Sequence, residues 1–303
     1  MRLAALVVGL LSLALAARES DGEVARAPVI AAAGDIACDP ADASFDQGRG
    51  TNAACRQLAT SNLLVRGRYT AVLTLGDNQY EDGAYTKYLA SYAPSWGRVK
   101  AITRPSPGNH EYGTARASGY VRYFGKAAGP AGRGYYSFDL GAWHLVSLNS
   151  NCSEIGGCGR GSPENRWLRL DLARHRTRCT LAYWHHARFS SGPHGDDLDV
   201  SGLWQTLYER GADVVLSGHD HDYERFAPLD PAGAVDPARG LREFVVGTGG
   251  RSHYGTGTPQ PGSEVRDSST FGVLALTLRP TGYDWRFLPA VGSFTDGGSA
   301  RCH

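Results

Sequence analysis

The chain has 303 residues, of which 42% are hydrophobic and 20% are charged, and its formal net charge is +1. This composition is typical of a soluble globular protein and provides enough apolar side chains for a large core. A net charge so close to zero gives no overall basic field for nucleic acid and no sign of an acidic tail, so charge alone indicates no partner.

The first 17 residues have the pattern of a secretory signal peptide. Met1 and Arg2 precede the apolar run LAALVVGLLSLALAA, which ends in small residues before a polar stretch. The run is shorter than the roughly 20 apolar residues that a membrane-spanning helix needs, and no other segment of the sequence reaches that length. We therefore predict cleavage near Ala16 or Ala17 and secretion of the mature protein, in preference to an uncleaved membrane anchor.

Short β-rich runs alternate with helical stretches along the rest of the chain. Strands are predicted at 27–34, 70–76, 134–141, 142–150, 179–185, 212–218, 242–250, 271–278 and 283–290. Helices are predicted at about 52–66, 84–96, 163–176 and 199–210. The third helix has the clearest start, because Ser162 is a good N-cap and Pro163 suits the first turn.

The order of these elements predicts the fold class. The first half reads as strand–helix–strand, and the part after about Arg242 reads as strands joined by tight turns. This order favours an α/β (α+β) fold in which two mixed β-sheets pack face to face with helices outside, a four-layer αββα sandwich, over a doubly wound single sheet. No linker divides the sequence, so we predict one domain over residues 28–303.

The six cysteines are an even number in a chain that has the pattern of an exported protein. Disulfides are therefore favoured over a zinc site, and the lack of a C-x-x-C pair also argues against a thiol redox enzyme. Sequence alone leaves many pairings open. Our hypothesis pairs Cys38 with Cys55, Cys152 with Cys158, and Cys179 with Cys302.

Polar motifs follow five apolar stretches of strand-like sequence. They are GD at Asp35, GDNQY with Asp77 and Tyr80, GNHE with Asn109 and His110, HH with His185 and His186, and GHDH with His219 and His221. Each motif alone is weak, because Gly-Asp often forms a turn and a lone histidine is usually packed or solvated. Ligand sites in open α/β folds gather outside the carboxyl ends of strands, so we expect the motifs to converge.

The side chains in these motifs are typical metal ligands. Oxygen and imidazole donors without thiolate suit zinc, iron or manganese. The candidate ligands are Asp35, Asp77, Tyr80, Asn109, His185, His219 and His221. They are too many for one catalytic ion that keeps open positions, whereas two ions bridged by a shared carboxylate would use them all.

The ordered series of motifs resembles the calcineurin-like metallophosphoesterase superfamily and, within it, the purple acid phosphatases. The resemblance extends from about Val29 to Tyr223. The superfamily's first motif usually contains Asp-x-His, whereas this chain has an alanine, Ala37, in place of the histidine, and Tyr80 in the second motif provides the missing donor. The GDIA sequence at Asp35 also departs from the Gly-Asp-x-Gly of purple acid phosphatases.

The resemblance implies roles for individual residues. Fe(III) would be bound by Asp35, Asp77, Tyr80 and His221. A second divalent ion, Zn, Fe or Mn, would be bound by Asp77, Asn109, His185 and His219. His110 and His194 would be catalytic, contacting phosphate oxygens or assisting the leaving group. His186 follows a ligand directly, so strand alternation predicts that it faces away and has a structural role.

These observations predict a secreted phosphatase that hydrolyses small-molecule phosphate monoesters by attack of a metal-bound hydroxide, with an acidic pH optimum. A phosphodiesterase or nucleotidase on the same metal core is the alternative. A non-catalytic secreted metal-binding protein fits less well, because the ligand set and His110 are intact. The sequence indicates no oligomeric state.

Overall fold

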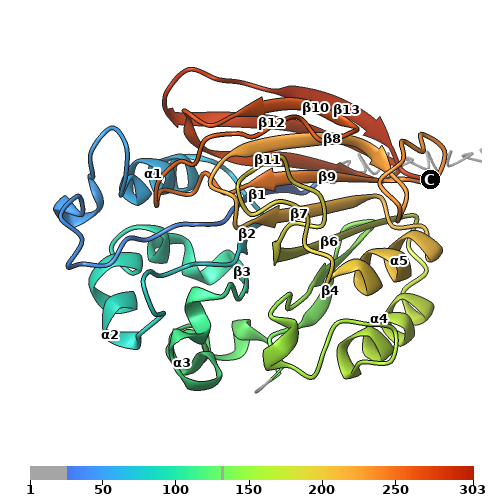
Figure 1. Cartoon of the computed structure of the whole chain (residues 1–303), viewed down its shortest axis with the longest axis horizontal. Helices are drawn as coiled ribbons and strands as arrows, with labels where there is room; N and C mark the ends of the chain where they lie inside the picture. Colours follow the sequence, from blue (N-terminus) through green and yellow to red (C-terminus); the bar gives the residue numbers. More distant parts are fainter. Residues whose placement is uncertain (1–25, 131–132) are drawn as a thin grey trace, which may run out of the picture.

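Two β-sheets pack face to face in the computed structural model, which describes residues 26–130 and 133–303 (Figure 1). One sheet contains β1 (Val29–Ala33), β2 (Ala71–Leu75), β3 (Thr103–Ser106), β11 (Phe271–Arg279), β12 (Gly282–Val291) and β13 (Gly297–Arg301). The other contains β4 (Tyr136–Leu140), β5 (Trp143–Ser147), β6 (Cys179–His186), β7 (Val214–Gly218), β8 (Tyr223–Leu229), β9 (Leu241–Val246) and β10 (Ser263–Asp267). Their strand orders are β13-β12-β11-β1-β2-β3 and β10-β8-β9-β7-β6-β5-β4.

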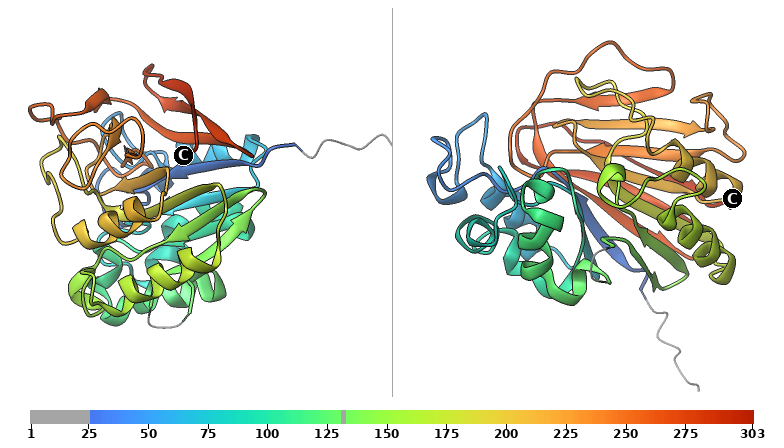
Figure 2. Two further views of the ribbon diagram at one scale, coloured as in Figure 1. Left: turned by 90° about the vertical axis from the view of Figure 1, so that its right-hand side faces the viewer. Right: turned by 60° about the horizontal axis from the view of Figure 1, so that its bottom comes forward.

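Helices cover the outer faces of the sheets. They are α1 (Gln57–Arg66), α2 (Tyr85–Lys87), α3 (Ser118–Phe124), α4 (Pro163–Arg174) and α5 (Ser201–Glu209). Helix α1 packs on β11 and β12 of the six-stranded sheet. Helices α4 and α5 lie together on the outside of the seven-stranded sheet, as Figure 2 also shows from two further directions. The predicted four-layer αββα sandwich is therefore confirmed.

Side-chain alternation along β6 explains how this sheet is buried on both faces. Leu181 and Tyr183 belong to the core between the two sheets, whereas Ala182 and Trp184 pack in the cluster beneath α4 and α5. Successive side chains of a strand point to opposite faces. A strand covered on both sides consequently reads as a continuous apolar run, which is the pattern of parallel sheets with helices outside.

The parallel strands determine where a site can form. Strands β1, β2 and β3 are parallel to one another, and so are β5, β6, β7 and β9. Strands β1 and β2 lie close to β6 and β7 of the other sheet. The loops that follow these strands therefore emerge near one another.

The predicted regular helix over 84–96 is wrong. A single α-helical turn, α2, is followed by a wider π-helical turn over Tyr88–Tyr92 and a 3₁₀ segment over Trp96–Ile102. Tertiary contacts explain the irregularity, because the Tyr92 backbone N–H donates to Gln79 Oε1 at 3.2 Å and the rings of Tyr88, Tyr92 and Trp96 are buried. The sequence also predicted neither α3 nor the strands β8, β10 and β13.

The three disulfides have the pairing of our hypothesis. They join Cys38 to Cys55, Cys152 to Cys158, and Cys179 to Cys302. The last closes a loop of 123 residues and ties the C-terminal tail to the start of β6. A cross-link of this span stabilises a fold chiefly by restricting the unfolded chain.

The signal-peptide prediction lies outside the described residues. Within residues 26–130 and 133–303, none of the helices has the length and apolar character that crossing a membrane requires.

Glu164 in the first turn of α4 is a buried carboxyl group that supports the loop after β5. Its Oε1 atom accepts the backbone N–H of Asn149 at 2.7 Å, and among the described residues its Oε2 atom has no hydrogen-bond partner. Burial raises the pKa of Glu164 to about 8, although the Asn149 N–H opposes the shift. The folded protein therefore keeps this group protonated over a range in which the unfolded chain ionises.

Replacing Glu164 with Gln should flatten the dependence of stability on pH. Because the folded-state pKa is raised, this group should lower the stability of the wild type as pH rises from about 4.5 to about 8, by at most about 1.4 kcal/mol per pH unit. Unfolding midpoints measured across this range for the wild type, Glu164→Gln and the exposed control Glu154→Gln test this. Glu243, whose pKa burial also raises to about 8, accounts for a residual slope. Equal slopes in all three proteins would contradict the prediction.

Candidate metal centre

Four of the predicted ligands meet at the phenol oxygen of Tyr80. This oxygen lies 2.9 Å from Asp35 Oδ1, 3.0 Å from Asp77 Oδ2 and 3.0 Å from His221 Nε2. His221 Nε2 is also 3.3 Å from Asp35 Oδ1. All four side chains are buried. Three oxygen donors and one imidazole nitrogen thus lie around a common point.

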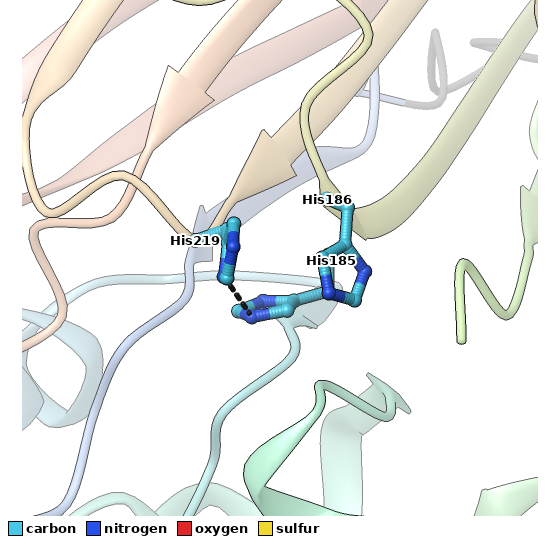
Figure 3. Close-up of side chains that lie close together, drawn as sticks. All are labelled: His185, His186 and His219. Atoms are coloured by element: carbon cyan, nitrogen blue, oxygen red, sulfur yellow. Dashed lines mark hydrogen bonds between the residues drawn. The ribbon is translucent and has the colours of Figure 1, made fainter. Parts of the chain in front are cut away.

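The remaining predicted ligands gather around His185 Nε2, beside the same aspartate. This nitrogen lies 3.0 Å from Asn109 Oδ1, 3.1 Å from His219 Nδ1 and 3.3 Å from Asp77 Oδ2. Figure 3 shows the rings of His185 and His219 turned toward each other. Asp77 Oδ2 is therefore common to both groups of donors, which is the arrangement that a bridging carboxylate needs.

The predicted convergence of strand ends produces this arrangement. The donors come from the loops after β1, β2, β3 and β7 and from the C-terminal end of β6, where His185 is the second-to-last residue. These elements belong to both sheets, so the site lies where the carboxyl ends of two parallel strand sets approach each other.

Three of the donor residues have left-handed backbone conformations. The φ angles are 59° at Asp35, 46° at Asp77 and 73° at His219. Such conformations cost about 1 kcal/mol or more for residues other than glycine and persist where the surroundings impose them, often at functional sites. Here the His219 N–H donates to Asp35 Oδ2 at 3.0 Å, which links two of the strained positions.

Glycines in the motifs allow the close approach of these loops. A Cβ atom at Gly108 would lie 2.1 Å from Asp77 Oδ1, and one at Gly76 would lie 2.5 Å from the ring of His185. Gly76 also has a φ of 81°, which favours glycine. The glycine that precedes Asp77 and the one that precedes Asn109 are thus required by space as well as by turn geometry.

Outer hydrogen bonds orient the imidazole ligands. The Nδ1–H of His185 donates to the carbonyl of Leu75 at 2.8 Å, so its Nε2 lone pair faces the other donors. His221 Nδ1 lies 2.9 Å from Ser252 Oγ. Partners of this kind fix the tautomer of a metal-binding histidine and raise its basicity.

The electrostatics of the centre favour a cation. Burial would raise the pKa of Asp77, but His185 and His110 outweigh it and hold that pKa far below its usual range. Burial, together with the charges of Asp35 and Asp77, raises the pKa of Tyr80 well above its usual value. A phenolate at Tyr80 therefore requires a strong cation among these oxygen atoms. Burial and the neighbouring His185 hold the pKa of His219 far below its usual range, which keeps that ring neutral for coordination.

The two histidines predicted to be catalytic lie beside the donors. The His110 ring centroid is 4.3 Å from that of Tyr80, and its Nδ1 lies 2.5 Å from the Glu81 carbonyl oxygen. The His194 ring centroid is 4.0 Å from that of His219. Both histidines are thus placed to contact a molecule bound at the centre.

The expectation that His186 faces away from the site is wrong. Its ring centroid lies 4.5 Å from that of His219 and 4.9 Å from that of His185 (Figure 3). The pairing of β6 with β7 shifts register between Tyr183 and His186, so simple alternation fails at the end of the strand. His186 consequently lines two hollows beside the centre, of about 340 and 400 Å³.

The loop after β9 contributes residues that the sequence reasoning missed. The Tyr254 ring stacks on His221 with a centroid distance of 4.0 Å, and the Arg251 guanidinium lies 5.2 Å from the Tyr80 ring. Arg251 also pairs with Glu81 at 2.7 Å. A signal was present, because the run GTGGRSHY follows β9 as another polar motif at a strand end.

A family model for calcineurin-like phosphoesterases matches residues 29–223. The chain belongs to the calcineurin-like phosphoesterase family. The matched range contains every predicted ligand, from the loop after β1 to the loop after β7.

Similar proteins include purple acid phosphatases. The chain is 30% identical over 179 residues to purple acid phosphatase 15 of Arabidopsis thaliana, an alignment that covers 51% of this chain and 32% of that protein. It is 29% identical over 200 residues to an uncharacterized protein of Mycobacterium tuberculosis, covering 53% of this chain and 38% of that protein. The matched region thus spans less than half the length of either relative.

The fold is similar to that of a solved purple acid phosphatase. The structure of the enzyme PPD1 from yellow lupin (Lupinus luteus) seeds superimposes with a TM-score of 0.70 at 16% identity, over 90% of this chain and 53% of that one. This likeness supports the αββα architecture.

Replacing Asp77 with Asn should reduce the bound metal to at most one ion per chain, because an amide bridges two cations poorly. Phosphatase activity should fall by more than about 100-fold, since losing even an outer-shell partner of a metal site costs about 10- to 100-fold. Elemental analysis of the purified variant checks the metal content. Asp82→Asn on the same loop, which removes a carboxylate paired with Lys87, is the matched control. A full metal complement in Asp77→Asn would contradict the bridging assignment.

Proposed function

We propose that this chain is a secreted binuclear-metal phosphatase of the purple acid phosphatase type, a hydrolase that acts on small phosphate monoesters. The observation that carries the proposal is the position of Asp77 Oδ2, which lies 3.0 Å from the phenol oxygen of Tyr80 and 3.3 Å from His185 Nε2. One carboxylate oxygen thus serves two donor groups of different chemistry.

The chemistry of each group supports a different ion. Carboxylate and phenol oxygens are hard donors, so the group formed by Asp35, Asp77, Tyr80 and His221 suits Fe(III). The group formed by Asp77, Asn109, His185 and His219 has more imidazole nitrogen and suits a divalent ion, Zn, Fe or Mn. Both groups fit the buried and negatively charged surroundings described above.

Two bridged cations at this position would neutralise a bound phosphate and acidify the attacking water, more strongly at a ferric ion, and the enzyme would then have an acidic optimum. The protein's part is positioning. His110 donates from Nδ1 to the Glu81 carbonyl oxygen, so in the imidazolium form its Nε2–H would give a proton to the leaving-group oxygen and the ring would return to the neutral form. His194 lines the same hollow as His219, with the two ring centroids 4.0 Å apart, which supports a contact between His194 and phosphate oxygens.

Secretion is supported by the three disulfides, because such bonds persist in oxidising compartments. The predicted signal sequence at residues 1–17 agrees with this location.

Replacing Tyr80 with Phe should abolish the visible absorption of the purified protein, because charge transfer from a phenolate to Fe(III) would give that absorption. Tyr112→Phe is the matched control, since its hydroxyl bonds Asn149 and contacts none of the donors. An unchanged visible spectrum in Tyr80→Phe would rule out a phenolate ligand.

Turnover of an aryl phosphate should exceed that of the corresponding aryl diester, and its rate should peak at acidic pH. Steady-state rates for both substrates between about pH 4 and 9 test this. A preference for the diester would favour the phosphodiesterase alternative. Metal-loaded protein that turns over neither substrate would favour a non-catalytic metal-binding protein.

A further inference from the structure

His186 lies at the centre without belonging to the predicted ligand set. One nitrogen each from His185, His186 and His219 lies within 4.8 Å of the other two (Figure 3). The register shift at the end of β6 is what brings His186 to this position, next to its neighbour His185. The ring of His186 could bind a metal ion, bind the substrate or have only a structural role. Its hydrogen bonds distinguish among these three roles.

Ser150 determines the tautomer of His186. The Ser150 hydroxyl oxygen accepts the backbone N–H groups of His185 at 3.3 Å and of His186 at 3.0 Å. A hydroxyl oxygen has two acceptor sites and one hydrogen. With both acceptor sites in use, the hydrogen is donated to His186 Nδ1, which lies 2.7 Å away. The neutral ring therefore carries its own hydrogen on Nε2.

The Nε2–H of His186 is available to a bound molecule. Among the described residues, His186 Nε2 has no hydrogen-bond partner. It is also absent from the set of fully buried unpaired atoms, so a molecule in the adjoining hollow can reach it. The side chain lines the hollow that contains Asn109 and Ser150 and the hollow that contains His194 and His219. A donor at this place therefore borders hollows that are also lined by Asn109 and His219, two residues of the second donor group, and by His194.

We propose that His186 is a catalytic residue whose Nε2–H donates a hydrogen bond to a phosphoryl oxygen of the substrate, and that Ser150 is the positioning residue that fixes this tautomer. The proposal rests on the proposed function and adds a substrate contact to it. No bond of His186 is broken in the reaction. The donor is preorganised, so it stabilises the negative charge that develops on phosphoryl oxygens without reorientation.

The same tautomer argues against His186 as a metal ligand. A ligand needs a lone pair, and here the Nδ1 lone pair accepts the Ser150 hydrogen while Nε2 is protonated. The neighbouring His185 shows the opposite arrangement, with its Nδ1–H bonded to the Leu75 carbonyl and its Nε2 free. Adjacent histidines on one strand end thus present a lone pair and a hydrogen-bond donor.

Two amide substitutions separate a donor from a structural role. Glutamine places its amide nitrogen near the position of Nε2, whereas asparagine places its amide oxygen near that of Nδ1 and keeps only the contact with Ser150. We expect His186→Asn to lose about 100-fold in kcat for an aryl phosphate, whereas His186→Gln, which keeps a donor near the position of Nε2, should recover most of that activity. Inhibition by inorganic phosphate should weaken in the same order, and Ser150→Ala should give a loss between the two.

Metal content and phosphate binding give the decisive comparisons. Both His186 variants should keep the wild-type number of ions, so loss of an ion from either would overturn the proposal in favour of a ligand role. Equal kcat in the wild type and His186→Asn, or higher activity in His186→Asn than in His186→Gln, would also overturn it. If the metal-loaded wild type turns over no phosphate ester, the proposed function fails. In that case the affinity for inorganic phosphate, measured by thermal shift, still tests the contact between His186 and a phosphoryl oxygen. An affinity in His186→Asn equal to that of the wild type would refute the contact.

Discussion

The carboxylate of Asp77 is buried between two groups of donors, with a phenol and an imidazole within 3.3 Å of one of its oxygen atoms. A buried carboxylate costs several kcal/mol unless positive charge and hydrogen bonds compensate for it. The His110 N–H and the neighbouring imidazoles provide part of this compensation. Cations bound at the centre would provide the rest, so metal binding and stability of the fold are coupled through this one side chain.

The loops that carry the donors come from both sheets. At two positions they approach each other so closely that only glycine fits. Gly76 and Gly108 leave space for the ring of His185 and the carboxylate of Asp77, while Asp35 and His219 adopt left-handed conformations. These are local penalties that a well-packed scaffold can sustain. The rigid strands on either side, buried on both faces, give the donors fixed positions, as a preorganised site requires.

The short segment at the end of β6 gives two neighbouring histidines different chemistry. His185 is held through Nδ1 by a backbone carbonyl and His186 through Nδ1 by the Ser150 hydroxyl. A carbonyl can only accept, whereas this hydroxyl must donate. The difference between a lone pair and an N–H at the centre therefore depends on the partner of each ring and not on the histidines themselves.

The sequence by itself predicted the candidate donors and their order, because each follows an apolar, strand-like stretch and parallel strands present their carboxyl ends at one edge. It also predicted the αββα layers, whereas the disulfide pairing was one hypothesis among many until the structure brought each pair of sulfur atoms together. Tertiary structure alone decided the break in the helix expected at 84–96, where Gln79 captures the N–H of Tyr92. It also decided the direction of His186 and the approach of Tyr254 to His221. These features depend on register shifts and on contacts between distant segments, which local patterns do not encode.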